Sequence, residues 1–476
     1  MLESNSKLFK KSFKNILYSF SAQGIALILS ITRVLLIPKI IGIEEYSYWQ
    51  LFLFWIGYVG FFHFGFNDGI LLKYGGRKYS DLDNKLLRSQ FIILLISQII
   101  VAVLMVIFTS LYSVEEERIF IGYSVALSLV VNNICGFYWC ILQSTNRFKE
   151  YSRAVTIDKF IFLFCIILMM IVNVRDFEIY VIVYLITTII SLIYTLYTCR
   201  DLIVGKLSSF QESIKETYDN VSIGVKLMIA NVASMLILGA GRFIIDRFWG
   251  IETFGKISLA LSITSMILLF INAISIVLFP ALRQVSKERL VETYIVLRTL
   301  LMYLLAGLLV LYIPIQYVLN LWLPKYTESL KYLAILFPLC IFEGKMQMLI
   351  STYLKVFRRE SVLLIINIVS VSISVLLSVI AAIVFNSVLF VIISMVLGVL
   401  IRCLIAELYL SKILNVNLIK GFIYDFILTS IFMISSWYLQ GVKSFLVYST
   451  AYLILLYCGR SDIRYALNSI KNYRKV

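Results

Sequence analysis

Residues 362–384 read VLLIINIVSVSISVLLSVIAAIV, an apolar run without a charged residue. A transmembrane α-helix needs about 20 consecutive apolar residues, so this segment is long enough to cross a bilayer. Similar stretches recur along the whole chain, and 61% of its 476 residues are hydrophobic whereas only 15% are charged. A soluble domain is roughly 45–50% apolar and about 25% charged. The sequence therefore predicts an integral membrane protein.

The apolar stretches predict about fourteen membrane spans joined by short polar loops. Their runs of Leu, Ile, Val and Phe do not alternate with polar residues, which excludes a transmembrane β-barrel and predicts an all-α polytopic membrane protein. The predicted spans are 14–38, 46–70, 89–112, 119–142, 154–174, 177–199, 222–244, 257–280, 293–316, 329–352, 362–384, 387–410, 418–439 and 443–459.

The formal charge of +16 raises the question of a nucleic-acid partner. Most Lys and Arg residues lie in alternate loops and near both ends of the chain, for example at 73–88, 147–153 and 355–359. Short loops rich in Lys and Arg stay on the cytoplasmic side of a membrane. We therefore predict that both termini are cytoplasmic. The basic residues then set the topology and attract anionic lipid headgroups, and no nucleic acid is expected as a partner.

The two halves of the chain repeat one another. GIEEYSYWQL at 42–51 matches GIETFGKISL at 250–259, and RFKEYS at 147–152 matches FRRES at 357–361 at nearly the same offset. Since six predicted spans lie in each copy, the repeat predicts two six-helix lobes related by a pseudo-twofold axis along the membrane normal. The predicted parts are an N-terminal lobe at 1–210, a C-terminal lobe at 211–412, and two additional helices with a basic cytoplasmic tail at 413–476.

Several short motifs, taken in order, resemble those of a known family. They are PKIIGIEEY at 38–46, FGFNDG at 64–69, LQSTNRF at 142–148, GRFIIDR at 241–247 and LFPAL at 278–282. The chain resembles the polysaccharide transporters (O-antigen flippases of the Wzx type) of the multidrug/oligosaccharidyl-lipid/polysaccharide exporter superfamily. Ser47 departs from the family pattern, which usually has Gly at this position, whereas Gly255 in the second copy keeps it.

The resemblance implies a flippase that moves an undecaprenyl-diphosphate-linked oligosaccharide, such as an O-antigen or capsule repeat unit, across the cytoplasmic (inner) membrane. It places the chain in lipopolysaccharide or other polysaccharide biosynthesis. The implied partners are the lipid-linked glycan, membrane lipids, and a polysaccharide polymerase with its chain-length machinery.

No cofactor or metal site is expected, because a single histidine cannot assemble a metal site alone. The sequence also lacks a Gly-x-x-x-x-Gly-Lys-Ser/Thr motif, so we expect a secondary-type transporter and not an ATP-driven pump or an enzyme. Acids within spans often relay protons, so coupling to H+ or Na+ is a further expectation.

Ionisable residues inside spans are costly in lipid and are by default candidates for function. A diphosphate needs cations, which Arg supplies as a bidentate fork and Lys as a point charge. The predicted substrate-binding residues, in a cavity between the lobes, are Arg33, Lys159, Lys226, Arg242, Glu343 and Lys345. The predicted gating or ion-coupling residues are Asp68, Asp158, Asp246 and Arg298.

Each of these candidates has a structural alternative. Arg33 and Arg242 lie toward the outer third of their spans and could extend to the headgroups, since long cationic side chains reach the interface. Glu343 and Lys345 lie near the middle of span ten and could pair with other helices instead of with substrate.

Two other functions stay open from the sequence. A polytopic polysaccharide polymerase handles the same kind of lipid-linked sugar, although the short outer loops here leave little room for a catalytic loop. A small-molecule drug exporter of the same superfamily is the second alternative. Its cavity should favour acids, whereas cations slightly outnumber acids within the predicted spans.

Overall fold

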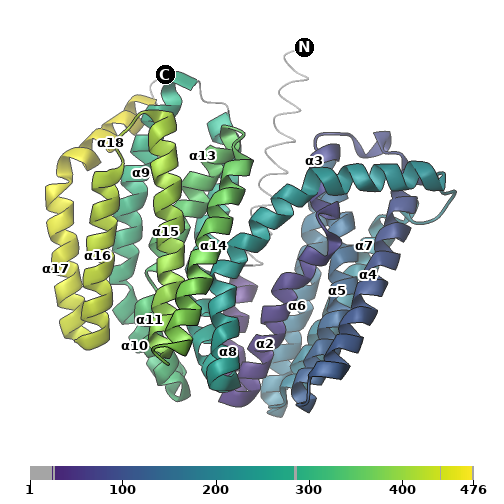
Figure 1. The fold of residues 1–476 in the computed structure, drawn as a ribbon, viewed down its shortest axis with the longest axis horizontal. Helices are drawn as coiled ribbons and strands as arrows, with labels where there is room; N and C mark the ends of the chain where they lie inside the picture. The colour runs from purple at the N-terminus through teal and green to yellow at the C-terminus, as the bar shows by residue number, and fades with distance from the viewer. Residues whose placement is uncertain (1–23, 25–26, 284–286, 440, 474–476) are drawn as a thin grey trace. The chain divides into compact units, whose positions relative to one another are not determined.

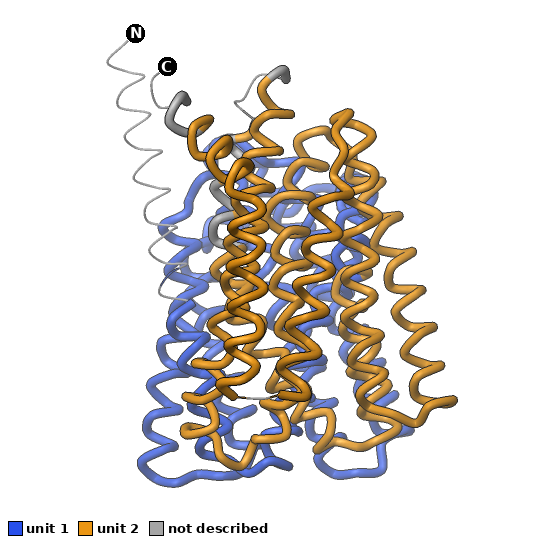
Figure 2. Tube along the Cα trace, turned by 90° about the vertical axis from the view of Figure 1, so that its left-hand side faces the viewer, with its two compact units in different colours: residues 1–232 blue, residues 233–476 orange. Residues whose placement is uncertain are grey.

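The computed structural model describes residues 24, 27–283, 287–439 and 441–473, and these residues form helices and turns with no strand. They pack into two compact units, Met1–Val232 and Ala233–Val476, which Figure 2 colours separately. The boundary lies inside one long helix, α8 (Phe210–Arg283), so each unit contains part of it. The predicted all-α architecture is confirmed.

Figure 1 shows the helices in chain order. Those of the first unit, besides the start of α8, are the helical residues 27–40, α2 (Ile43–Val59), η1 (Gly60–His63), α3 (Phe66–Tyr74), η2 (Tyr79–Asp81), α4 (Asn84–Tyr112), α5 (Glu116–Ser144), α6 (Phe148–Val172), α7 (Phe177–Thr198) and η3 (Arg200–Leu202). Those of the second unit, after α8, are α9 (Lys287–Val310), α10 (Tyr312–Trp322), η4 (Pro324–Tyr326), α11 (Thr327–Leu336), α12 (Leu339–Lys345), the π-helical turn η5 (Met346–Ile350), α13 (Ser351–Val356), α14 (Glu360–Ile383), α15 (Val388–Leu414), α16 (Ile419–Tyr438), α17 (Gly441–Cys458) and α18 (Arg460–Tyr473).

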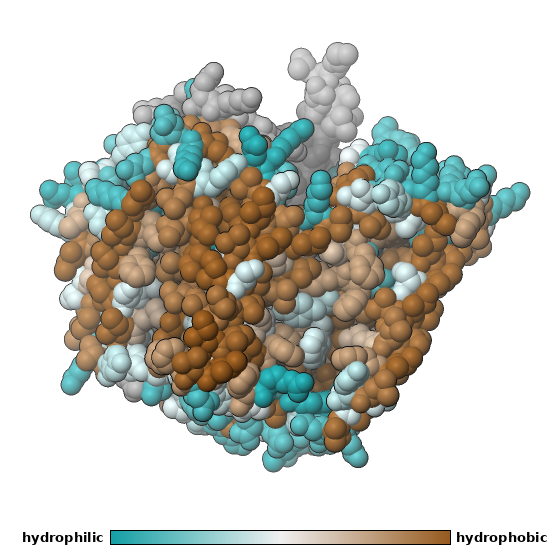
Figure 3. Space-filling view, viewed as in Figure 1, coloured by the Kyte–Doolittle hydropathy of each residue, from teal (hydrophilic) through white to brown (hydrophobic). Residues whose placement is uncertain are grey.

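The described residues contain ten helices long and apolar enough to cross a membrane, or up to twelve if each of two bent pairs is one span. The predicted count of fourteen is therefore not confirmed. Two reasons are visible in the chain. Helix α8 contains two predicted spans on either side of Gly250 and is counted once. The first half of the first predicted span lies outside the described residues. Hydrophobic side chains cover the helix flanks and hydrophilic ones gather at the helix ends (Figure 3), as expected of a multi-pass membrane protein.

Helix α5 is the centre of the first unit. It packs against α2, α3, α4, α6 and α7, and 67% of its most apolar window is buried, compared with 11% for α4. The large side chains Phe66, Phe137 and Tyr138 form the core between α3, α4 and α5. Since α5 is enclosed while α4 presents most of its apolar surface outward, α4 is suited to face lipid tails.

Predicted span two is broken. The segments Ile43–His63 and Phe66–Tyr74 are bent by 61°, and both Phe64 (φ 52°) and Gly65 (φ 82°) adopt the left-handed conformation at the break. A break inside a membrane frees backbone carbonyls, which then need partners within the protein. Asn133 Nδ2 donates to the carbonyl of Val59 at 3.0 Å and Gln98 Nε2 donates to that of Phe62 at 3.0 Å.

The start of α8 packs directly against this break. A side chain at Gly65 or Gly69 would overlap the backbone of α8 near Gly224 and Asn220, and one at Gly224 would overlap the backbone of Gly65. The Asn220 amide also donates to Gln90 Oε1 on α4 at 3.0 Å. The residues without side chains thus allow α3 and α8 to touch backbone to backbone.

In the second unit, the short helix α12 is buried at every residue and packs against α9 and α15. It belongs to predicted span ten, which is bent by 48° between Pro324–Leu336 and Leu339–Val356. Pro338 lies at the bend, where its missing N–H and its ring interrupt regular helix hydrogen bonding. The bend places Glu343 and Lys345 in the interior of the unit.

The contact between α3 and α8 gives a first test. Replacing Gly69 with Val should destabilise the first unit by about 1–3 kcal/mol, because the new side chain must displace the backbone at Asn220. The matched control is Gly60→Ala, since nothing lies within 4 Å of a side chain added at Gly60. Thermal unfolding of the detergent-purified variants measures the effect, and equal melting temperatures for the two variants would contradict the close packing.

Candidate functional site

The first unit brings three predicted site residues together on two helices. Arg33 lies on the helical segment 27–40, and its guanidinium stands over the ring of Phe162 on α6, 6.0 Å from the ring centre. Arg33 and Lys159 line one small cavity, together with Phe162. Asp158 interacts electrostatically with both cations. Two cations against one acid leave this group, the Arg33 cluster, with a formal charge of +1.

The Arg33 cluster has polar atoms without partners. The guanidinium Nε of Arg33 and the Oδ1 of Asp158 are buried and make no hydrogen bond within the described structure. A buried donor without an acceptor is costly. An anion placed beside Arg33 would supply the missing acceptor and would neutralise the excess positive charge.

Arg242 occupies a comparable place on α8 in the second unit. Its Nε and Nη2 donate to Ser258 Oγ at 3.1 and 2.8 Å, and its guanidinium lies 4.9 Å from the centre of the Phe254 ring. Asp246, one turn further along α8, is buried at 7% exposure. Both cations predicted from the repeat, Arg33 and Arg242, therefore lie against aromatic rings.

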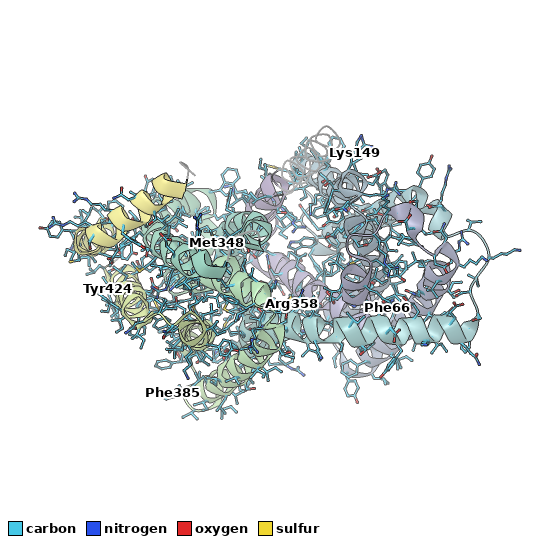
Figure 4. All side chains as sticks on the ribbon, turned by 90° about the horizontal axis from the view of Figure 1, so that it is seen from above. Phe66, Lys149, Met348, Arg358, Phe385 and Tyr424 are labelled. Carbon is cyan, nitrogen blue, oxygen red and sulfur yellow. The ribbon has the colours of Figure 1, made fainter. Side chains whose placement is uncertain are left out.

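A buried ionic network occupies the core of the second unit. Lys345 Nζ lies 2.5 Å from Asp425 Oδ2 and 3.0 Å from Glu407 Oε1. Arg298 Nε lies 2.9 Å from the same Glu407 oxygen, and its Nη2 donates to the carbonyl of Leu418 at 2.8 Å. These four charged residues, here called the Lys345 network, come from α9, α12, α15 and α16. Tyr424, labelled in Figure 4, precedes Asp425 on α16.

Glu343 belongs to a second pair beside the Lys345 network. Its carboxylate accepts from Arg402 Nη1 at 3.0 and 3.2 Å and from Gln347 Nε2 at 2.8 Å. Arg402 Nε donates to Asn367 Oδ1 on α14 at 2.8 Å. Glu343 and Lys345 thus pair with different residues and not with each other: Glu343 pairs with Arg402 on α15, and Lys345 pairs with Glu407 on α15 and Asp425 on α16. The formal charges of each group sum to zero.

The remaining predicted residues are dispersed. Lys226 is exposed on the part of α8 that belongs to the first unit. Asp68 lies on α3 with its Oδ2 3.9 Å from His63 Nε2. Within the described ranges, no group of three or more His, Cys, Asp and Glu side chains could hold a metal ion.

Residues outside the predicted site complete these groups. Arg402, Glu407 and Asp425 are the partners of Glu343, Arg298 and Lys345. In the sequence each of these residues stands out as a charge within an apolar span. Which charges pair with one another depends on how the helices pack, and the sequence does not show this. Gln98 and Asn133, which satisfy the break in span two, carry a similar signal as amides within apolar runs.

The Lys345 network predicts a specific stability pattern. Lys345→Met leaves Asp425 without its cation in a buried site, which should cost about 3–5 kcal/mol. Adding Asp425→Asn should recover part of that loss, because the remaining acid, Glu407, keeps Arg298. The control is Lys443→Met, at an exposed position on α17.

Thermal unfolding followed by fluorescence-detected size exclusion compares the four proteins. If Lys345→Met is as stable as the control, or if the double variant is less stable than the single one, the Lys345 network does not stabilise the second unit.

Comparisons with known proteins place the chain in a family. A family model described as polysaccharide biosynthesis protein matches residues 12–286. No curated protein sequence matches the chain significantly. Among solved structures, a lipid II flippase MurJ in an inward closed conformation is similar with a TM-score of 0.66 and 17% identity, covering 94% of this chain and 99% of that one.

An inward-facing multidrug resistance MATE transporter of the MOP superfamily is similar with a TM-score of 0.61 and 14% identity, covering 83% of this chain and 98% of that one. At such identities the likeness establishes the fold alone, which is that of MOP-superfamily transporters. Because the family model spans more than half of its length, this chain belongs to the polysaccharide biosynthesis protein family.

Proposed function

We propose that the protein is a flippase that moves an undecaprenyl-diphosphate-linked oligosaccharide, the repeat unit of an O-antigen or capsule, across the cytoplasmic membrane. The Arg33 cluster is the observation that carries this proposal: a net positive charge and an unpartnered guanidinium nitrogen in the interior of a membrane-spanning unit. An anion is the natural ligand of such a group. Family membership and the likeness to a lipid II flippase fold support a lipid-linked sugar as the cargo.

In this proposal Arg33 and Lys159 of the first unit and Arg242 of the second unit are binding residues for the diphosphate, and transport proceeds by alternating access. Lys226 guides the anionic substrate from its exposed position on α8. Asp158 and Asp246 keep the gating or ion-coupling role expected from the sequence, since acids within spans often relay protons. The glycan occupies the polar interior and the polyprenyl chain stays in lipid.

The Lys345 network and Glu343 hold their charges in protein–protein pairs in this conformation. Direct contact of Glu343 and Lys345 with substrate stays a prediction, and it requires these pairs to open. Arg298, proposed for gating, would then transmit such a change between α9, α15 and the start of α16 through Glu407 and Leu418.

Further parts of the proposal follow from the sequence. Both termini face the cytoplasm, where Lys and Arg concentrate. The flippase uses an ion gradient, H+ or Na+, and no ATP. It works beside a polysaccharide polymerase and chain-length machinery, which consume the units that it delivers.

A drug exporter is the second candidate, favoured by the similarity to MATE transporter folds. The charge of the Arg33 cluster separates the two, because a cavity for cationic drugs would need a net negative charge and this cluster has +1. A polymerase would act on the same lipid-linked sugar. Deleting a polymerase gene would leave unpolymerised units on the outer leaflet.

The leaflet position of the lipid-linked oligosaccharide tests the function in cells. Deleting the gene should trap complete repeat units on the inner leaflet, and the intact chain should release them. Units that accumulate unpolymerised on the outer leaflet would instead indicate a polymerase. A change in drug efflux without a change in either pool would indicate an exporter.

The site is tested by variants in the same assay. Arg33→Gln, Lys159→Gln and Arg242→Gln should each lower translocation at least ~10-fold, since a charge-assisted hydrogen bond to phosphate is worth about 1.5–3 kcal/mol. Arg175→Gln, in an exposed loop of the first unit, should leave translocation unchanged. Membrane abundance is measured for all four. Normal surface glycan with the three site variants would rule out this assignment.

A further inference from the structure

The break in span two holds the one histidine of the chain next to an acid. The backbone N–H of Gly65, which lies in the left-handed turn, donates to His63 Nδ1 at 3.1 Å. The other ring nitrogen, Nε2, lies 3.9 Å from Asp68 Oδ2. Asp68 belongs to the first turn of α3, whose first residue, Phe66, is labelled in Figure 4.

This geometry fixes the form of the imidazole ring. Because Nδ1 accepts the Gly65 N–H, a neutral ring carries its proton on Nε2, the atom that faces Asp68. Adding a proton to Nδ1 would abolish the hydrogen bond to Gly65. The carboxylate of Asp68 remains able to bind a proton. No described residue donates a hydrogen bond to it, and within the described structure its one basic neighbour is His63.

The surroundings contain few other titratable groups. The thiol of Cys140 on α5 interacts electrostatically with Asp68, and Tyr58 on α2 lies against the η1 turn through Phe61. Helix α4 presents the uncharged Gln98, and α8 presents Asn220 and Gly224 near the break. Further along the same α3–α8 contact, Glu216 and Asp219 of α8 pair with Lys73 of α3. The side chains of His63 and Asp68 keep 11% and 23% exposure, so the pair is not sealed inside the unit, unlike the fully buried Lys345.

We propose that Asp68 is a proton-binding site and that His63, held neutral by Gly65, is its positioning residue. A proton from water adds to the carboxylate, so the Asp68 and His63 pair changes from a formal charge of −1 to 0. Broken helices at membrane depth commonly form ion sites, because their ends present polar groups where lipid cannot.

Proton binding at Asp68 acts on the contact between α3 and α8. The carboxylate lies in the first turn of α3, where a negative charge stabilises the helix end, and its neutralisation removes that stabilisation. The next residue, Gly69, touches the backbone of α8 at Asn220. As the coupling ion of the transporter, the proton would therefore change the contact of α8 with the broken span. This coupling role rests on the proposed function, whereas the proton site itself does not.

Nitrogen NMR of the single histidine tests the site without any substrate. The full-length chain is labelled with 15N-histidine, purified with a histidine-free tag, placed in lipid nanodiscs and titrated from about pH 5 to 8, a range that includes the ordinary pKa of histidine. We expect Nδ1 to remain an unprotonated acceptor throughout, while the Nε2–H resonance shifts along a single one-proton curve.

The variants assign that curve. Asp68→Asn should abolish the Nε2–H shift, and Asp68→Glu should retain it. Asp81→Asn, in the η2 turn of the same unit, should leave it unchanged and is the matched control. Protonation of Nδ1 within the range, a flat Nε2–H resonance, or an undiminished shift in Asp68→Asn would each overturn the proposal.

The outcome is separable from that of the proposed function. A chain that flips lipid-linked oligosaccharide but shows no Asp68-dependent titration lacks this proton site. If the chain shows the titration but moves no lipid-linked sugar, the proton site is present and the protein transports another substrate.

Discussion

The fold depends on one constraint: no backbone N–H or C=O can be left without a partner where water is absent. Uninterrupted helices meet this constraint by themselves, and the break at Phe64 and Gly65 meets it with side chains. The side-chain amides of Asn133 and Gln98 donate to the carbonyls of Val59 and Phe62, and Asn133 Nδ2 also donates to Gln98 Oε1 at 2.6 Å. The break is therefore compatible with a membrane-spanning segment, because side chains of α4 and α5 satisfy the carbonyls that it frees.

Charges obey the same constraint in two different ways. The Lys345 network and the pair of Glu343 with Arg402 cancel their charges within the protein and tie five helices of the second unit together. The Arg33 cluster does not cancel, because Arg33 and Lys159 face a single acid. Only the second arrangement favours an incoming anion. We therefore propose that the neutral network stabilises the second unit and that the cluster with excess charge binds substrate.

The sequence predicts the membrane class, the helical fold and the charged spans, because apolar runs and isolated charges are local signals. It does not predict the break inside 46–70 or the pairing of Lys345 with Asp425. The break depends on Asn133 and Gln98, which come from other helices, and ionic partners such as Lys345 and Asp425 are 80 residues apart. Arg33, Asp158 and Lys159 are better candidates as a group than the sequence indicates, since only the packing of α6 against residues 27–40 brings them together.

The central claim is that this chain alone moves a diphosphate-linked glycolipid between leaflets. The direct measurement uses purified protein in vesicles containing fluorescent undecaprenyl-diphosphate-linked oligosaccharide, with a membrane-impermeant quencher or glycosidase that reaches only the outer leaflet. The account predicts that protein-containing vesicles expose nearly all of the glycolipid, whereas empty vesicles expose about half. Vesicles with Arg33→Gln protein should expose the inner-leaflet half at least ~10-fold more slowly than vesicles with the intact chain. If the intact chain exposes no more glycolipid than empty vesicles do, both without a gradient and under every imposed pH or sodium gradient, the account is wrong.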